Sequence, residues 1–207
     1  FIKSIITEKL NAKIIIVGND YRFGYKASGD INTLKDYEDI FSFTTDIVDF
    51  EMEDDQDKIS SGHLRDLIRN GEVKKANKYL GRYYKIRGKV VHGRHRGRTL
   101  NFPTANLDLA FPYVMPRDGV YLTRTSIGGQ VHYGLTNIGS NPTFEEGEDK
   151  KIETYLFDFN RSIYGEDISV EFINFQRPDY KFASAEDLIK QMDKDKAEGL
   201  SYIEKYL

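Results

Sequence analysis

The chain contains no cysteine, and this absence excludes several kinds of chemistry at once. No disulfide can stabilise the fold, and no thiolate can serve as a nucleophile or a metal ligand. No apolar run approaches the roughly 20 residues of a membrane-spanning helix, and no signal peptide is visible, so we expect a cytoplasmic protein without a membrane partner. The first residue is Phe1 and not Met, and we therefore expect the sequence to be part of something longer.

The 207 residues give room for one large domain or two small ones. Hydrophobic residues make up 39% and charged residues 30%, which is typical of a folded globular protein and not of a disordered one. Every charged residue in 36–57 is acidic, and every one in 82–98 is basic. A local basic stretch on a chain of net charge -3 favours a small anionic ligand over a long polyanion, although a solvated strand edge would look the same.

Residues 1–80 have an α/β pattern. Residues 13–17 form a β-branched run that predicts a buried strand of a parallel sheet, and residues 47–50 predict a second strand. Ser60 or Ser61 is a suitable N-cap for a helix that Gly71 ends, and a second helix is expected over residues 72–80.

Residues 81–207 have a different pattern, and we place the domain boundary near Gly81. Short segments rich in β-branched and aromatic residues alternate with turns, and Gly128-Gly129 marks a tight hairpin. The segments are residues 90–91, 120–127, 131–138, 152–159 and 168–175. Five or six strands at this spacing predict a small closed antiparallel barrel over about residues 82–183.

A C-terminal helix is predicted over about residues 184–206. Ser184 with Asp187 resembles a capping box. One apolar helix face is expected, with a gap near Asp195, and Gly199 should weaken the helix by about 1 kcal/mol relative to alanine. The residues expected on that face are Leu188, Ile189, Met192, Leu200, Ile203 and Leu207.

The segment that carries the clearest chemical signal runs from residue 89 to 107. A strand leads into a glycine-spaced basic loop at residues 93–98, and Gly93 and Gly97 permit the backbone conformations that close approach to phosphates requires. The sequence FPTAN follows at residues 102–106. In an extended chain Thr104 and Asn106 point the same way, so their oxygens are suited to Mg²⁺ shared with a nucleotide phosphate. A turn-stabilising hydrogen-bond motif is the alternative explanation of these two residues.

These residues resemble the riboflavin kinase family, of which FPTAN is the signature. Further elements follow in the family's order over roughly residues 82–207: NPTF at 141–144, ETYLFDF at 153–159, YG at 164–165 and RPDYKF at 177–182. Two departures are Asn101 where glycine is usual and Asp179 where glutamate is usual.

The resemblance implies a six-stranded antiparallel barrel with a C-terminal helix, and transfer of the ATP γ-phosphate to riboflavin to give FMN and ADP. It implies that Thr104 and Asn106 hold Mg²⁺ and that Glu153 is the general base. The ATP-binding set would be Gly93, Arg96, Gly97, Arg98, Pro103 and Thr104, and Arg177, Lys181 and Phe182 would close over the flavin. Without the resemblance, Glu153 on its strand would be explained equally well as a solvent-facing residue or a partner of Lys151.

The first 80 residues resemble the end of the FMN adenylyltransferase module found in bacterial bifunctional FAD synthetases. Residues 17–24 match a G-x-D-F-R-F-G element that supplies Asp20 and Arg22. Residues 59–65 resemble an I-S-S-T-x-I-R element that supplies Ser60, Ser61 and Arg65, with Gly62 replacing the threonine. Helix N-termini of this kind suit phosphates. The resemblance implies that residues 1–80 are an α/β remnant of a Rossmann-like nucleotidyltransferase domain. The HxGH-type element of such modules is absent, so we expect this chain to make FAD poorly.

Three alternatives stay open at this stage. FAD synthesis is expected in the full-length parent if it carries the HxGH element. A nucleic-acid-binding barrel would account for the basic stretch and the 13% aromatic content, although the net charge argues against it. A flavin binder without catalysis would tolerate loss of the Glu153 carboxylate. We expect small-molecule partners and no nucleic acid, and the sequence carries no signal for the oligomeric state.

Overall fold

The computed structural model describes residues 1–49, 59–93, 102–140 and 150–207. The chain divides into two compact units, Phe1–Ser60 and Ser61–Leu207, and each is described by itself.

The first unit is built on two short parallel strands, β1 (Ile14–Gly18) and β2 (Thr44–Val48), with Ile14 opposite Thr44. Its helical segments are η1 (Ile2–Thr7), η2 (Tyr25–Ala27), α1 (Ile31–Asp36) and α2 (Glu38–Phe41). The expected parallel pairing is confirmed, but the expected burial of the first strand holds only at Val17. Ile14 and Ile16 are 64% and 66% exposed, because the small core of this unit covers one face of the two strands.

Two helices open the second unit: α3 (Ser61–Arg69) and α4 (Val73–Leu80). Gly81, with φ of 63°, ends α4 as predicted. The buried Asn77 side chain ties α4 to the barrel: its Nδ2 donates to the Phe172 carbonyl at 2.8 Å, and its Oδ1 accepts from the Tyr84 amide at 2.7 Å. These helices therefore belong to the same compact unit as the barrel, and the two compact units divide after Ser60. The domain boundary near Gly81 stays a prediction.

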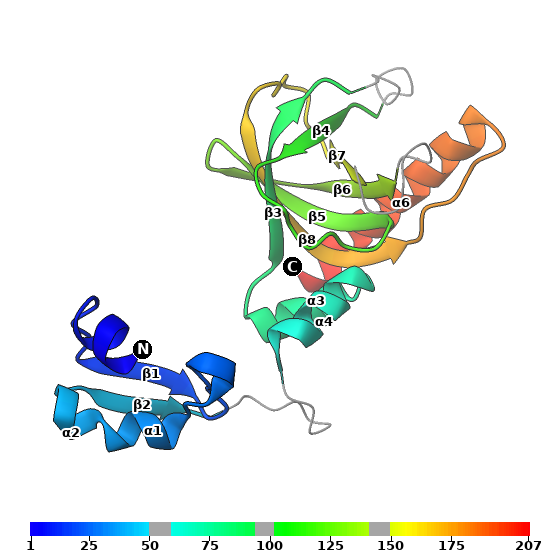
Figure 1. The fold of residues 1–207 in the computed structure, drawn as a ribbon. Coiled ribbons are helices and arrows are strands. Elements are labelled where there is room, and N and C mark those ends of the chain that lie inside the picture. The colour runs from blue at the N-terminus through cyan, green and yellow to red at the C-terminus, as the bar shows by residue number, and fades with distance from the viewer. Residues whose placement is uncertain (50–58, 94–101, 141–149) are drawn as a thin grey trace. The chain divides into compact units, whose positions relative to one another are not determined.

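Six antiparallel strands close into a barrel in the order β3-β4-β7-β6-β5-β8 (Figure 1). Their bounds are β3 (Tyr84–Val91), β4 (Thr104–Leu109), β5 (Gly119–Ile127), β6 (Gln130–Ser140), β7 (Lys150–Leu156) and β8 (Asp167–Arg177). The first strand pairs with the last, with Tyr84 opposite Phe172. Gly128 and Gly129, with φ of 54° and 85°, form the predicted hairpin between β5 and β6. The expected antiparallel barrel is confirmed.

Inward-facing apolar side chains fill the barrel, because residues alternate between its two faces along each strand. Ile86, Ile138, Ile152 and Phe172 are almost completely buried there. A short polar layer crosses the interior: the hydroxyl of Thr136 lies 2.8 Å from that of Thr123 and 3.0 Å from that of Thr154. Each of these three hydroxyls thus has a partner, which offsets the cost of removing it from water.

The C-terminal helix α6 (Ala185–Tyr206) packs on the outside of the barrel, and Ser184 caps it by accepting from the Asp187 amide. The expected apolar face is only partly correct. The buried positions are Asp195 and Gly199, while Leu200 is 37% exposed. A Cβ on Gly199 would lie 3.3 Å from Leu122, Phe157 and Gln176, so the helix approaches the barrel closely at the glycine. No helix in the described part of the chain is long and apolar enough to cross a membrane.

Candidate active site

The FPTAN segment enters the barrel as strand β4, and its sequence alternates between the two faces. Ala105 and Leu107 belong to the barrel core, so Thr104 and Asn106 face the other way and are half-buried. Phe102 is buried just before the strand, and its ring packs edge-on against Tyr155 with 5.0 Å between ring centroids. This aromatic contact fixes the start of β4 beside β7.

Glu153 lies directly opposite Asn106 in the register of β7 against β4. On its other side Glu153 lies opposite Asn137 of β6. The three residues Asn106, Glu153 and Asn137 therefore form a row across three adjacent strands, which we call the polar row. Directly opposed residues have Cβ atoms about 5 Å apart, so their polar groups can act on one ligand.

Asn137 was not among the residues expected from the sequence, because it lies inside a strand and matches none of the motifs considered. The structure distinguishes it by its side-chain oxygen: the Oδ1 atom is buried and has no hydrogen-bond partner among the described residues. A buried acceptor without a donor is costly, which makes Asn137 a candidate contact for a ligand.

Gly93 contacts the polar row from the end of strand β3. A Cβ placed on Gly93 would lie 2.3 Å from Nδ2, 2.5 Å from Cγ and 2.7 Å from Oδ1 of Asn106. Only glycine permits this approach, so the Asn106 amide packs directly against the backbone at the start of the basic loop.

A turn at Tyr164-Gly165 braces the same end of β3. The Gly165 amide donates to the Val90 carbonyl at 2.8 Å, and Gly165 has φ of 79°. The His92 and Tyr164 rings stack with 3.9 Å between centroids. The predicted YG turn therefore supports the strand from which the glycine-spaced loop departs.

A cleft of about 1710 Å³ brings the predicted residues together: Gly93, Pro103, Thr104, Asn106 and Glu153 all line it. Single small-molecule sites usually measure about 300–1,000 Å³, so the cleft has room for two ligands. Arg96, Gly97 and Arg98 lie outside the described residues, as does the NPTF element at 141–144.

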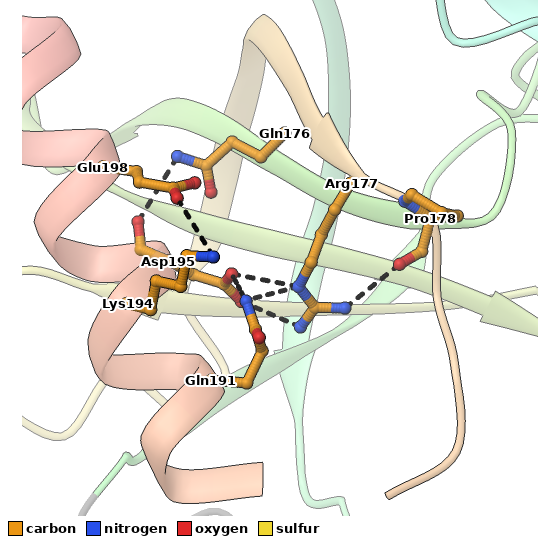
Figure 2. A network of polar contacts seen from close by, with 7 residues as sticks. All are labelled: Gln176, Arg177, Pro178, Gln191, Lys194, Asp195 and Glu198. Atoms are coloured by element: carbon orange, nitrogen blue, oxygen red, sulfur yellow. Dashed lines mark hydrogen bonds and ion pairs between the residues drawn. The ribbon is translucent and has the colours of Figure 1, made fainter. Parts of the chain in front are cut away.

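The residues predicted to close over the flavin lie where β8 leaves the barrel. The Arg177 guanidinium pairs with Asp195 of α6 (Figure 2). It also lies over the rings of Tyr180, at 4.7 Å, and Phe182, at 5.7 Å. Lys181 is exposed and Phe182 is half-buried. None of these three predicted residues lines the cleft that holds Glu153.

The residues expected from the adenylyltransferase resemblance are divided between the two units. Asp20, Arg22 and Ser60 belong to the first unit, and Ser61 and Arg65 belong to the second, on α3. Arg22 forms an ion pair with Asp30 at 3.1 Å. The Thr33 backbone amide and hydroxyl, followed by the Arg22 charge, lower the pKa of Asp30.

No group of three or more histidine or carboxylate side chains in the described ranges is placed to hold a metal ion. Thr104 and Asn106 supply a hydroxyl and an amide oxygen on one face of β4, and oxygen ligands of this kind suit Mg²⁺ when phosphates complete its coordination.

Comparison with known proteins gives two family matches: riboflavin kinase over residues 80–203 and FAD synthetase over residues 1–63. The bifunctional riboflavin kinase/FMN adenylyltransferase of Listeria monocytogenes is 39% identical over 196 residues, covering 95% of this chain and 62% of the relative. The corresponding protein of Bacillus subtilis is 40% identical over 195 residues, covering 93% of this chain and 61% of the relative.

A crystal structure described as a macrolide-efflux protein from Streptococcus pneumoniae is also similar, with a TM-score of 0.86 and 39% identity. The match covers 95% of this chain and 62% of that one. The chain thus spans about 62% of the length of the Listeria and Streptococcus proteins.

Proposed function

The chain belongs to the riboflavin kinase family, and from that premise we propose that its barrel unit transfers the γ-phosphate of ATP to the terminal ribityl hydroxyl of riboflavin. The products are FMN and ADP. The observation that carries the proposal is the placement of Glu153 directly opposite Asn106, on one face of adjacent strands and in a cleft large enough for two ligands.

Glu153 acts as the general base in this proposal. The ribityl oxygen attacks the γ-phosphorus, a new oxygen–phosphorus bond forms, and the bond to the ADP oxygen breaks. The hydroxyl proton passes to the Glu153 carboxylate. A primary alcohol is a weak acid, so a carboxylate within hydrogen-bond reach contributes about 10²–10⁴-fold to the rate. The remainder of catalysis is positioning and charge stabilisation, as in other phosphoryl transfers.

Thr104 and Asn106 would hold Mg²⁺ through their side-chain oxygens. An ion bound there neutralises charge on the phosphate oxygens. Gly93 limits where the Asn106 amide can lie, since any larger residue would displace it. Pro103 shares the cleft, and the loop residues Arg96, Gly97 and Arg98 are proposed to cover the phosphates.

Arg177, Lys181 and Phe182 are proposed to act on the flavin side. Their support is the family match over residues 80–203 together with the aromatic pair Tyr180 and Phe182, whose rings lie 4.8 Å apart. Flat aromatic side chains suit a flat ring system such as isoalloxazine.

A second activity, adenylylation of FMN to FAD, is favoured by the FAD synthetase match over residues 1–63. We propose it for a form of the protein that also carries an HxGH element, in which Asp20, Arg22, Ser60, Ser61 and Arg65 would contribute to the site. The four histidines of this sequence form no HxGH element, so FAD production by this chain alone is expected to be low.

The test is to incubate the 207-residue chain with riboflavin, ATP and Mg²⁺ and to separate the flavins by chromatography. FMN without FAD is the expected result. FMN together with FAD would show that the adenylyltransferase residues present are sufficient. A folded protein that forms no FMN, while a Glu153→Gln control binds riboflavin equally well, would indicate a flavin binder. Salt-sensitive binding of single-stranded nucleic acid without any flavin binding would favour the nucleic-acid-binding alternative.

A further inference from the structure

The most completely buried carboxylate among the described residues outside the proposed active site is Asp195, at the middle of α6. Its side chain is 2% exposed, although it lies on a surface helix. Burying a charge is costly unless it is paired. The pairing here is extensive: Asp195 accepts from Arg177 Nε at 2.9 Å, from Arg177 Nη2 at 2.8 Å and from Gln191 Nε2 at 2.7 Å (Figure 2).

The partner, Arg177, uses every nitrogen of its guanidinium within the protein. Nε and Nη2 donate to Asp195, and Nη1 donates to the carbonyl of Pro178 at 3.1 Å. A bidentate arginine–carboxylate pair fixes orientation as well as position. Arg177 is only 14% exposed, so solvent competes little for these bonds.

Arg177 in turn supports the segment that follows it, residues 178–182, which we call the flavin-side segment. Its guanidinium donates a hydrogen bond to the Pro178 carbonyl and lies over the rings of Tyr180 and Phe182. The Asp195–Arg177 pair and the three contacts that Arg177 makes with this segment therefore connect α6 to a stretch of chain that belongs to no helix or strand.

The flavin-side segment extends back to the polar row. Asp179 Oδ2 lies 3.6 Å, and Asn137 Nδ2 lies 3.5 Å, from the point that a Cβ on Gly139 would occupy. Asn137 is the direct neighbour of Glu153 in the strand register. A shift of the segment would therefore change the surroundings of Asn137, next to the site proposed for the ribityl chain.

We infer that Asp195 is a positioning residue for the flavin substrate: by orienting Arg177 it holds the flavin-side segment against the barrel near Asn137, the strand neighbour of Glu153. Asp195 itself touches no substrate. The inference rests on the proposed function for its choice of ligand, while the ordering of the segment can be measured without any ligand.

The decisive variant is Asp195→Asn, which keeps the shape of the side chain and removes its charge. Loss of the charge-assisted pair should free the segment. We expect the KM for riboflavin to rise by about tenfold or more, with the KM for ATP and kcat nearly unchanged, because the ATP-side residues lie on other strands. Gln191→Ala removes one hydrogen bond to Asp195 and should raise the KM for riboflavin by a smaller factor. It replaces Asp195→Asn as the test variant if that protein folds poorly.

A ligand-independent readout comes from trypsin. Lys181 is exposed and precedes Phe182, whereas Arg177 precedes proline and is a poor cleavage site. Cleavage after Lys181 should accelerate by about tenfold in Asp195→Asn, since proteolysis follows the population of the opened segment.

Two controls separate positioning from general loss of stability. Lys194→Ala alters the neighbouring residue of α6, 66% exposed, and should change neither cleavage nor KM. Ile127→Val removes a buried methyl group from the last residue of β5. The first residue of that strand, Gly119, lies beside Arg177 and Pro178, so this change is at the far end of the strand from the flavin-side segment. It should lower the melting temperature without a selective effect on riboflavin.

Faster cleavage at Lys181 together with a riboflavin-selective KM change, absent from both controls, would support the inference. Unchanged cleavage in Asp195→Asn, or equal increases in the KM values for riboflavin and ATP, would overturn it. If wild-type protein forms no FMN and binds no riboflavin, the proposed function fails; the trypsin result then still decides whether Asp195 orders the segment.

Discussion

Replacing Gly93 with alanine tests the packing that places Asn106 opposite Glu153. The new Cβ would lie 2.3 Å from Asn106 Nδ2. Because carbon and nitrogen atoms make contact at about 3.5 Å or more, the amide must retreat by roughly 1 Å. A displacement of about 1 Å in a phosphoryl-transfer site costs about 100-fold in rate, which corresponds to about 2.7 kcal/mol of transition-state stabilisation.

The assay is the kcat/KM for MgATP in FMN formation, measured beside two comparison proteins. Gly81→Ala provides the matched control: its Cβ would meet nothing within 4 Å, although Gly81 has φ of 63°. It should cost about 1–2 kcal/mol of stability and leave the rate unchanged. In an Asn106→Ala background the Gly93→Ala change should have little further effect, because the group that it displaces is gone.

Full activity of Gly93→Ala, with the fold preserved, would refute the reasoning. It would mean that the contact between Gly93 and the Asn106 amide does not determine the catalytic geometry. A penalty of equal size in the Asn106→Ala background would refute it as well, since the clash would then act through some other group.

Three further predictions concern the proposed base, the proposed metal site and the barrel tyrosines. Glu153→Gln should lower kcat by about 100-fold or more with riboflavin affinity retained; near-normal turnover would remove Glu153 as the base. Asn106→Ala should raise the MgATP concentration needed for turnover, seen as a shifted Mg²⁺ titration; an unchanged titration would remove Asn106 as a ligand. Burial raises the pKa of Tyr84 to about 12 and also raises that of Tyr121. The folded state favours the neutral form of both tyrosines, so their contribution to the free energy of unfolding should be complete below pH 10 and decline as pH rises through 12. Tyr84→Phe should make the melting temperature fall less steeply over this alkaline range.

The barrel could be predicted from sequence because the residue patterns of its strands and turns depend only on neighbouring residues in the chain. β-branched residues alternate in β5 and β7, and Gly128-Gly129 has the composition of the turn that the structure shows. The FPTAN strand was identified in the same way, since alternation places Thr104 and Asn106 together whatever the rest of the fold.

The contact face of α6 could not be predicted from hydrophobic periodicity. A pattern of apolar residues leaves a gap at Asp195, yet Asp195 and Gly199 are the buried positions. The reason is long-range: Arg177 arrives from β8 to pair with Asp195, and the barrel surface comes close enough that only glycine fits at 199. Neither Arg177 nor the barrel surface that meets Gly199 can be inferred from the sequence of the helix itself.

The role of Asn137 and the attachment of α3 and α4 to the barrel could not be predicted, for the same reason. Asn137 is of interest because it lies opposite Glu153 on the adjacent strand, a relation that only the strand register reveals. The helices α3 and α4 look like a continuation of the α/β pattern before them, but the hydrogen bonds of Asn77 attach α4 to β3 and β8. The residue pattern changes from α/β to strand-rich at Gly81, whereas the two compact units divide after Ser60.

The closure of the barrel by pairing β3 with β8 has a consequence for synthesis on the ribosome. The first strand of the barrel finds one of its two neighbours only when the last strand has emerged, so every earlier stage leaves an open strand edge. Pairing between such distant segments gives a high contact order and slow folding. The nascent barrel is therefore a natural client for chaperones, and shortening the chain within β8 should yield aggregation and not a partly folded enzyme.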